Sequence, residues 1–151
     1  MEKTNSELNS VAAIDRDVWI PFMAAYPALD ADLALSTCST AYIHAGGPTA
    51  LAKGREAYLT DFQSFFDTVR DNGDRIDLEF RFTQRILGEG VASERGLFRM
   101  DVQPADGERR QRFGYFHVFL RVEQGRWRIL TDYDEPGGTA DEFDAATPIA
   151  G

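Results

Sequence analysis

The sequence predicts an α+β domain in which helices cover one face of a curled antiparallel sheet. In the first half of the chain, apolar residues recur every three or four positions, beginning with Val11, Ile14 and Val18, which is the spacing of a helix with one buried side. After Gly73 the period becomes two, and apolar and polar residues alternate through residues 76–83. Helices and strands are therefore segregated along the chain, which is typical of α+β architecture.

The composition is that of one ordinary globular domain. The chain has 151 residues, 43% hydrophobic and 27% charged, which is long enough to fold without a metal or a disulfide. Its one cysteine, Cys38, fits a reducing compartment, so we expect a cytoplasmic protein. The net charge of -9 disfavours nucleic acid as a partner. No apolar run approaches the roughly 18 residues of a membrane span, and residues 1–10 lack the apolar core of a signal peptide, so we expect no membrane partner.

Three helices are predicted before the sheet. The first covers residues 10–26, where Pro21 removes one backbone hydrogen bond and predicts a kink. A short second helix follows Asp30, which is a favourable N-cap residue. The third begins near residue 54 and ends at Gly73, which readily adopts the left-handed conformation that stops a helix.

One short strand and four long strands complete the predicted fold. Residues 41–44 form the short strand between the helices, and the long strands follow from residue 76 onward, separated by turns rich in glycine. Residues 113–122 are apolar on both faces, so this strand needs cover on both sides. Residues 124–125, Gln-Gly, predict a tight hairpin into the last strand, 126–134.

Both ends of the chain are polar and lack periodicity. We expect residues 1–9 to be disordered and residues 10–134 to form a single domain. Residues 135–151 begin with a Pro-Gly-Gly sequence and contain scattered aspartates, which predicts a flexible acidic tail.

The order and spacing of several short segments carry a family resemblance. These are the long first helix ending near Asp30, the sequences Tyr42-Ile43-His44-Ala45-Gly46-Gly47 and Gly54-Arg55-Glu56-Ala57, and Gly125-Arg126-Trp127-Arg128-Ile129-Leu130 running into Asp132-Tyr133-Asp134. Over residues 10–134 the chain resembles the nuclear transport factor two-like superfamily, which includes ketosteroid isomerases and SnoaL-like polyketide cyclases. The resemblance implies a cone-shaped, curved antiparallel sheet wrapped around three N-terminal helices, a deep apolar pocket and usually a homodimer, but no single activity.

The resemblance also implies a role for His44. Tyr42 and His44 share one face of their strand, and in ketosteroid isomerases the end of that strand carries the carboxylate that moves a substrate proton. A histidine, with an ordinary pKa of about 6.5, could serve as the general base there; alternatively, His44 bonds to the backbone or lines a pocket without reacting. The resemblance places the isomerase oxyanion donors near Trp19 or Ile20 and near His117 or Val118. None of these residues supplies a phenol or a carboxylic acid, which argues against steroid isomerisation.

The hairpin predicts a second polar pair. If residues 124–125 form a two-residue turn, Glu123 opposes Arg126 and His117 opposes Asp132, with Cβ atoms about 5 Å apart. A His–Asp pair occurs in catalytic triads and around metals, but no serine or cysteine motif accompanies it, and a structural ion pair is the alternative. A bulge of one residue would undo the pairing.

The same register divides the hairpin into two faces. One is almost wholly apolar and suits contact with the helices, with Thr131 and Tyr133 continuing it toward the pocket mouth. The other is too apolar for water yet partly polar, which favours a partner subunit. The predicted homodimer face contains Tyr115, His117, Phe119 and Asp132.

Three functions therefore remain open. The first is a homodimeric protein that binds a small hydrophobic molecule in a pocket lined by Trp19, Phe22, Tyr42, His44, Phe62, Thr131 and Tyr133. The second is an isomerase, cyclase or dehydratase that needs no cofactor or metal and acts on a hydrophobic carbonyl substrate, with His44 as general base. The third is a non-catalytic association module, whose cavity would be filled by Phe and Trp side chains. Convergence of a second polar group on His44 would distinguish the second function from the first.

Overall fold

A computed structural model describes residues 5–150 of the chain. It contains the helices α1 (Asn5–Leu8), α2 (Val11–Ile14), η1 (Asp15–Trp19), α3 (Ile20–Ala28), α4 (Ala31–Ser36), α5 (Arg55–Asn72) and α6 (Ala140–Ala145). The strands are β1 (Cys38–Gly46), β2 (Leu51–Gly54), β3 (Arg75–Leu87), β4 (Val91–Gln103), β5 (Arg110–Glu123), β6 (Arg126–Pro136) and β7 (Thr147–Pro148). Of the N-terminal segment that the sequence predicts to be disordered, residues 1–4 lie outside the described residues, and residues 5–8 form helix α1.

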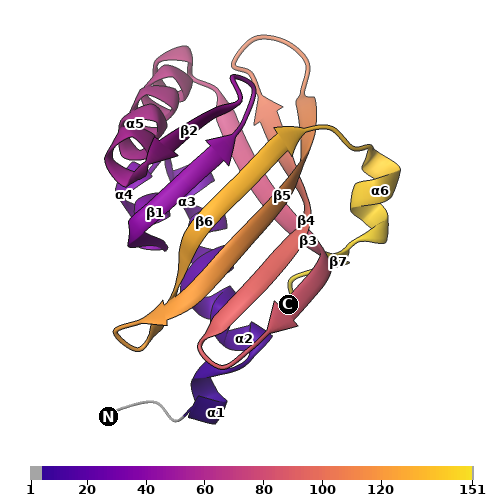
Figure 1. Cartoon of the computed structure of the whole chain (residues 1–151). Coiled ribbons are helices and arrows are strands. Elements are labelled where there is room, and N and C mark those ends of the chain that lie inside the picture. The colour runs from indigo at the N-terminus through magenta and orange to yellow at the C-terminus, as the bar shows by residue number, and fades with distance from the viewer. Residues whose placement is uncertain (1–4, 151) are drawn as a thin grey trace.

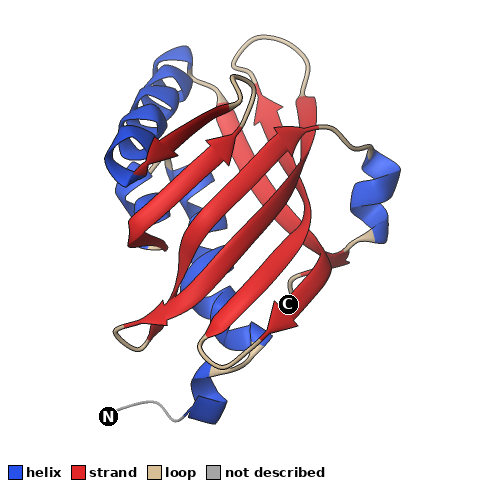
Figure 2. Cartoon of the chain, in the orientation of Figure 1, coloured by secondary structure: helices blue, strands red, loops and turns tan. Residues whose placement is uncertain are grey.

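The strands form one curved, unclosed sheet in the order β2-β1-β6-β5-β4-β3-β7 (Figures 1 and 2). This confirms the predicted α+β cone, with one difference: the sheet is mixed, because β1 runs parallel to β6 while every other neighbouring pair is antiparallel. The two short edge strands, β2 and β7, have no counterpart in the sequence prediction.

The long N-terminal helix accommodates Pro21 through a wider turn. Residues Asp15–Trp19 form a π-helical turn, in which the N–H of Ile20 donates to the carbonyl of Asp15. Proline cannot donate to the preceding turn, and a π-turn is a known way to absorb such a break. The helix then ends at Leu29, which has a φ of 53°, and Asp30 caps α4 by accepting from the N–H of Leu33 at 3.0 Å, as predicted.

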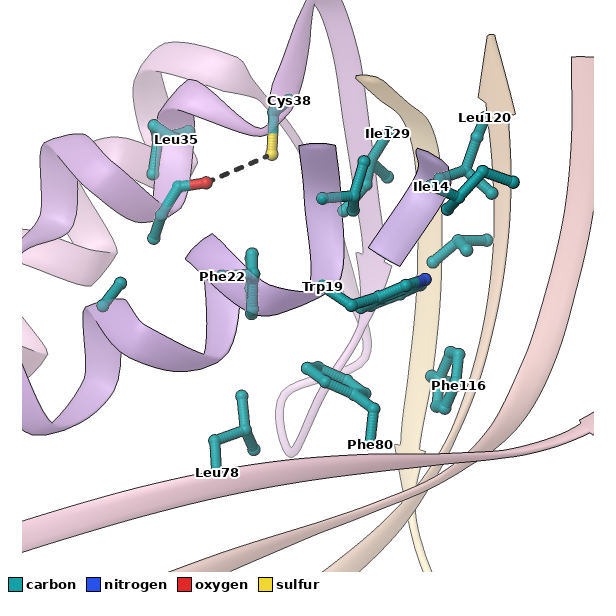
Figure 3. Close-up of a cluster of buried hydrophobic side chains, with 14 of the residues drawn as sticks. Ile14, Trp19, Phe22, Leu35, Cys38, Leu78, Phe80, Phe116, Leu120 and Ile129 are labelled. Carbon is teal, nitrogen blue, oxygen red and sulfur yellow. Dashed lines mark hydrogen bonds between the residues drawn. The ribbon is translucent and has the colours of Figure 1, made fainter. Parts of the chain in front are cut away.

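The core lies between these helices and the concave face of the sheet. Trp19 and Phe22 project from the helix toward Phe80 and Phe116 of the sheet (Figure 3). The ring centroids of Trp19 and Phe80 are 4.7 Å apart, and those of Phe22 and Phe80 are 5.7 Å apart. Cys38 is buried beside them, and burial raises the pKa of its thiol to about 12, so the thiol is unreactive.

The β5–β6 hairpin begins in the predicted register and then departs from it. Gln124 and Gly125 both have positive φ, as a tight hairpin turn requires, and the pairs from Glu123–Arg126 to Leu120–Ile129 are those predicted. Beyond them, Leu130 is an extra residue, so that Phe119 pairs with Thr131, Val118 with Asp132 and His117 with Tyr133. The predicted pairing of His117 with Asp132 is therefore wrong, because this bulge reverses which side chains of β6 face the helices.

The C-terminal segment packs on the sheet instead of forming the expected flexible tail. Strand β7 pairs with β3, and helix α6 lies against the face of the sheet opposite the other helices (Figure 1). Phe143 of α6 is completely buried, against Leu97 and beneath the guanidinium groups of Arg81 and Arg99, which lie 4.6 and 4.8 Å from its ring centroid. This one aromatic anchor fixes a segment whose composition is otherwise polar.

Candidate functional site

A cavity of about 180 Å³ lies between α3, α5 and the concave face of the sheet. An apolar protein cavity of roughly 150 Å³ is large enough for benzene, so this one admits a ligand of about one ring. Its walls consist of aromatic rings, two aliphatic side chains and two carboxylates. The lining residues are Phe22, Tyr26, Tyr58, Phe65, Leu78, Phe80, Phe98, Met100, Phe116, Asp132 and Asp134.

The two carboxylates owe their position to the bulge in β6. Asp132 and Asp134 pair with Val118 and Phe116, which are inward-facing core residues of β5, and so they share the inner face of β6. Strand β1 lies directly beside them, and Gly46 makes this approach possible: a Cβ at Gly46 would lie 1.9 Å from the carbonyl oxygen of Asp134. Tyr42 and His44 of β1 are thereby brought against the carboxylates.

His44 forms a close pair with Asp134. Its Nε2 lies 2.7 Å from Oδ2 of Asp134, and its ring stacks on Tyr58 with centroids 4.4 Å apart and planes 7° from parallel. Burial lowers the pKa of His44, but the hydrogen bond to Asp134 and the charges of Asp132 and Asp134 more than offset this effect, so its pKa lies above the ordinary value. The imidazolium form of His44 is therefore more stable than that of an unpaired histidine, and its Nε2 is engaged by Asp134.

Asp132 is a carboxyl group that titrates near neutral pH. Burial raises its pKa to about 7, together with the charge of Asp134, while His44 and a hydrogen bond from Tyr42 oppose the rise. The hydroxyl of Tyr42 donates to Oδ2 of Asp132 at 3.2 Å. Burial also raises the pKa of Tyr42 well above its ordinary value, so this phenol stays neutral and remains a donor.

His44, Asp132 and Asp134 lie close enough together to raise the question of a metal. Each offers one potential donor atom, and these atoms lie within 4.8 Å of one another. The same three side chains already bond within the protein, His44 to Asp134 and Asp132 to Tyr42. A metal bound to Nε2 of His44 would have to displace the hydrogen bond to Asp134, whereas an organic ligand in the cavity would not.

The structure gathers some of the predicted pocket residues and separates others. Phe22 lines the cavity, Phe62 lines an adjoining cleft together with Asp61, and Tyr42 and His44 stand directly behind the carboxylates. Trp19 lies deeper in the core, where its Nε1 donates to Oε1 of Glu94 at 2.6 Å.

Thr131 and Tyr133 do not reach the pocket that the sequence assigns to them. The bulge at Leu130 turns this part of β6 around, so that Tyr133 is 49% exposed and Thr131 pairs with the exposed Phe119. Asp134 is a site residue that the sequence did not predict, and Asp132 lies on the face opposite to the predicted one. The signal that could have found them is the alternation Asp-Tyr-Asp at the end of a buried strand, which puts two carboxylates on one face.

The outer face of the sheet remains largely uncovered next to α6. Ile43, Thr131 and Phe119 are neighbours across β1, β6 and β5, and Ile43 and Phe119 are 51% and 50% exposed. His117 lies on this face with its Nε2 2.8 Å from Oγ of Ser93. The hydroxyl of Tyr115 donates to Glu142 of α6, so the C-terminal segment already engages part of the predicted dimer face.

With its curved sheet, covering helices and acid-lined aromatic cavity, the chain belongs to the class of α+β cone folds. Solved structures confirm this: a ketosteroid isomerase-like protein from Erwinia carotovora atroseptica is 16% identical, with 90% of this chain and 100% of that chain covered and a TM-score of 0.64. An NTF2-like (nuclear transport factor 2-like) protein with a cystatin-like fold from Novosphingobium aromaticivorans is 15% identical, with 91% and 88% covered and a TM-score of 0.69. The chain therefore has the NTF2-like fold, as the resemblance predicted.

Another similar structure is a Xanthomonas campestris domain named for the association domain of calcium/calmodulin-dependent protein kinase II. It is 13% identical, with 86% of this chain and 87% of that chain covered and a TM-score of 0.64. No family model matches the sequence, and no curated protein matches it. These likenesses define the fold, which hosts more than one function.

None of the helices within residues 5–150 is long and apolar enough to cross a membrane.

Proposed function

We propose that this chain is a cofactor-independent enzyme that binds a small, largely apolar molecule in the cavity and moves a proton on it, as an isomerase, cyclase or dehydratase does. One observation carries the proposal: polar groups converge on His44, and two of them, Asp132 and Asp134, face the aromatic cavity. A pocket that only binds an apolar molecule does not need a half-buried pair of carboxylates, which costs stability.

The geometry favours Asp132 over His44 as the general base. A base works best when its pKa lies near the working pH, and the pKa of Asp132 is raised to about 7. Tyr42 holds Oδ2 of Asp132, which leaves Oδ1 for the substrate. His44 instead pairs with Asp134 through Nε2 at 2.7 Å, so this nitrogen is already engaged and Asp132 is the group that gains and returns the proton.

Proton exchange tests this proposal without knowledge of the natural substrate. One-ring ketones such as cyclohexanone would be incubated with the protein in heavy water, and loss of the α-proton signal would be followed by NMR. We expect exchange above the buffer rate, reduced by about 10²- to 10⁴-fold in Asp132→Asn, which keeps the shape of the side chain but cannot act as a base. Asp106→Asn, in the exposed turn after β4, is the matched control and should leave the rate unchanged. Equal rates in the wild type and in Asp132→Asn would refute the assignment.

A homodimer through the outer face of the sheet is the second part of the proposal. Phe119 and Ile43 expose apolar side chains on either side of Thr131 on the outer face of the sheet, and such an apolar surface suits contact with a partner. Because α6 covers the region of Tyr115, the contact is expected to centre on β1, β5 and β6. The similarity to a domain named for an association domain is compatible with such a contact. The cavity in the described residues argues against association as the sole function, since a pure association module is expected to fill it.

A further inference from the structure

The walls of the cavity are unusual in their charge. Aromatic rings from α3, α5 and three strands surround it, and its polar lining groups include the carboxylates of Asp132 and Asp134. Of the residues that the structure describes, those lining the cavity include neither lysine nor arginine. Aromatic faces carry negative electrostatic potential, so rings and carboxylates both attract a positive charge.

The charges around the cavity do not balance within the protein. His44 pairs with Asp134 and not with Asp132, whose hydrogen bond comes from the hydroxyl of Tyr42. Tyr42 and Tyr58 stay neutral because burial raises the pKa of each well above its ordinary value. At the adjoining cleft, Asp61 is already bridged by Lys53. When Asp132 is ionised, one negative charge next to the cavity is left without a matching cation.

We propose that the ligand of this cavity carries one positive charge on a small alkylated nitrogen, such as a methylated amine or a quaternary ammonium group. The inference rests on the proposed function only in that it uses the same cavity. A monocation would supply the missing charge beside Asp132 and place its alkyl groups against rings such as Phe22, Phe80 and Phe116. A ligand that enters as an anion would meet two carboxylates and, among the described residues that line the cavity, no lysine or arginine.

The aromatic rings and the carboxylates that line the cavity select a ligand by its charge as well as by its size. A neutral molecule of the same shape gains the contacts with the rings but not the attraction to the carboxylates. Choline and its uncharged carbon isostere 3,3-dimethylbutan-1-ol (dimethylbutanol below) separate these two contributions. The two molecules differ only in the quaternary atom, which is a charged nitrogen in choline and a carbon in dimethylbutanol. Both are about the size of cyclohexanone, so they match the one-ring ligand that the cavity admits.

The test measures both dissociation constants by isothermal titration calorimetry at pH 8, in the presence of EDTA so that no metal occupies the site. We expect choline to bind at least about tenfold more tightly than dimethylbutanol. Asp132→Asn should reduce this ratio to about twofold or less, because it removes the unbalanced charge while keeping the side-chain shape. Phe65→Leu replaces an exposed ring at the edge of the cavity and should weaken the binding of choline more than the binding of dimethylbutanol. Asp106→Asn, far from the cavity, should leave the ratio as it is in the wild type.

The outcomes separate this inference from the proposed function. Equal affinity for the two probes, tighter binding of the neutral one, or binding of neither would overturn the inference. A tenfold preference that survives Asp132→Asn would overturn the role of the carboxylates. None of these results changes the rate of ketone exchange in heavy water, which tests the proton transfer by itself.

Discussion

Replacing Asp132 by asparagine should stabilise the protein at alkaline pH. The pKa of this carboxyl group is raised to about 7 in the folded chain, whereas an aspartate in an unfolded chain has a pKa of about 3.9. The folded state therefore binds this proton more tightly than the unfolded state does. Its contribution to stability is fully present below about pH 4 and is lost as the pH rises through about 7.

The size of the effect follows from the same two pKa values. A difference of about three units, at about 1.4 kcal/mol each, gives an upper bound near 4 kcal/mol for the penalty at pH 8. Asparagine carries no charge at any pH and can still accept from Tyr42 through its amide oxygen. We therefore expect Asp132→Asn to raise the free energy of unfolding by between about 1 and 4 kcal/mol at pH 8, with the gain shrinking steadily toward pH 4.

Urea denaturation at pH 4.5, 6 and 8, followed by tryptophan fluorescence, measures this difference. Asp134→Asn is the informative comparison, because it weakens the pair that His44 forms at 2.7 Å and should lower stability by about 1 kcal/mol at pH 6. Equal stability of the wild type and Asp132→Asn at pH 8 would contradict the raised pKa of this carboxyl group. A stability gain from Asp132→Asn that is smaller at pH 8 than at pH 4.5 would contradict it as well.

Two further predictions concern the outer face of the sheet. Phe143→Ala removes a completely buried ring that packs against the guanidinium groups of Arg81 and Arg99, so we expect a loss of about 3 kcal/mol and faster proteolysis after residue 136. Asp141→Asn, a surface change on the same helix, should behave like the wild type. Phe119→Asp places a charge in the proposed dimer contact, so sedimentation at micromolar concentration should show a dimer for the wild type and a shift toward monomer for the variant. A monomeric wild type would remove the dimer from the proposal.

The sequence predicts most of the frame because that frame follows from periodicity and local caps. Asp30, Gly73 and the Gln124–Gly125 turn are each found where the local chemistry demands a cap or turn. Strand β3 follows from the alternation of apolar residues, which depends only on which face is buried, and strands β4 and β5 follow from the apolar segments between turns rich in glycine. The parallel pairing of β1 with β6 could not be derived in this way, because it joins segments about 90 residues apart and leaves no local pattern.

The candidate site was harder to predict because it breaks the rule that guided the frame. Hydrophobic patterning places Thr131 and Tyr133 inside and the neighbouring aspartates outside, and an unbroken hairpin would do so. The structure does the opposite, and the single unpaired residue Leu130 is the cause. Functional sites are expected at positions that violate local preference. A partly buried carboxylate lowers stability, so its presence indicates a role other than stabilising the fold.

One backbone irregularity therefore produces two surfaces. By adding one residue to β6, the bulge directs Asp132 and Asp134 toward the aromatic cavity. It thereby also directs Tyr133 toward the outer face, on which Phe119 is exposed. The chemistry of the pocket and the character of the outer face are consequently coupled through residues that alternate along one strand. A change in the register of β6 cannot alter the pocket without also altering the proposed contact with a second subunit, so the two proposed features depend on the same local structure.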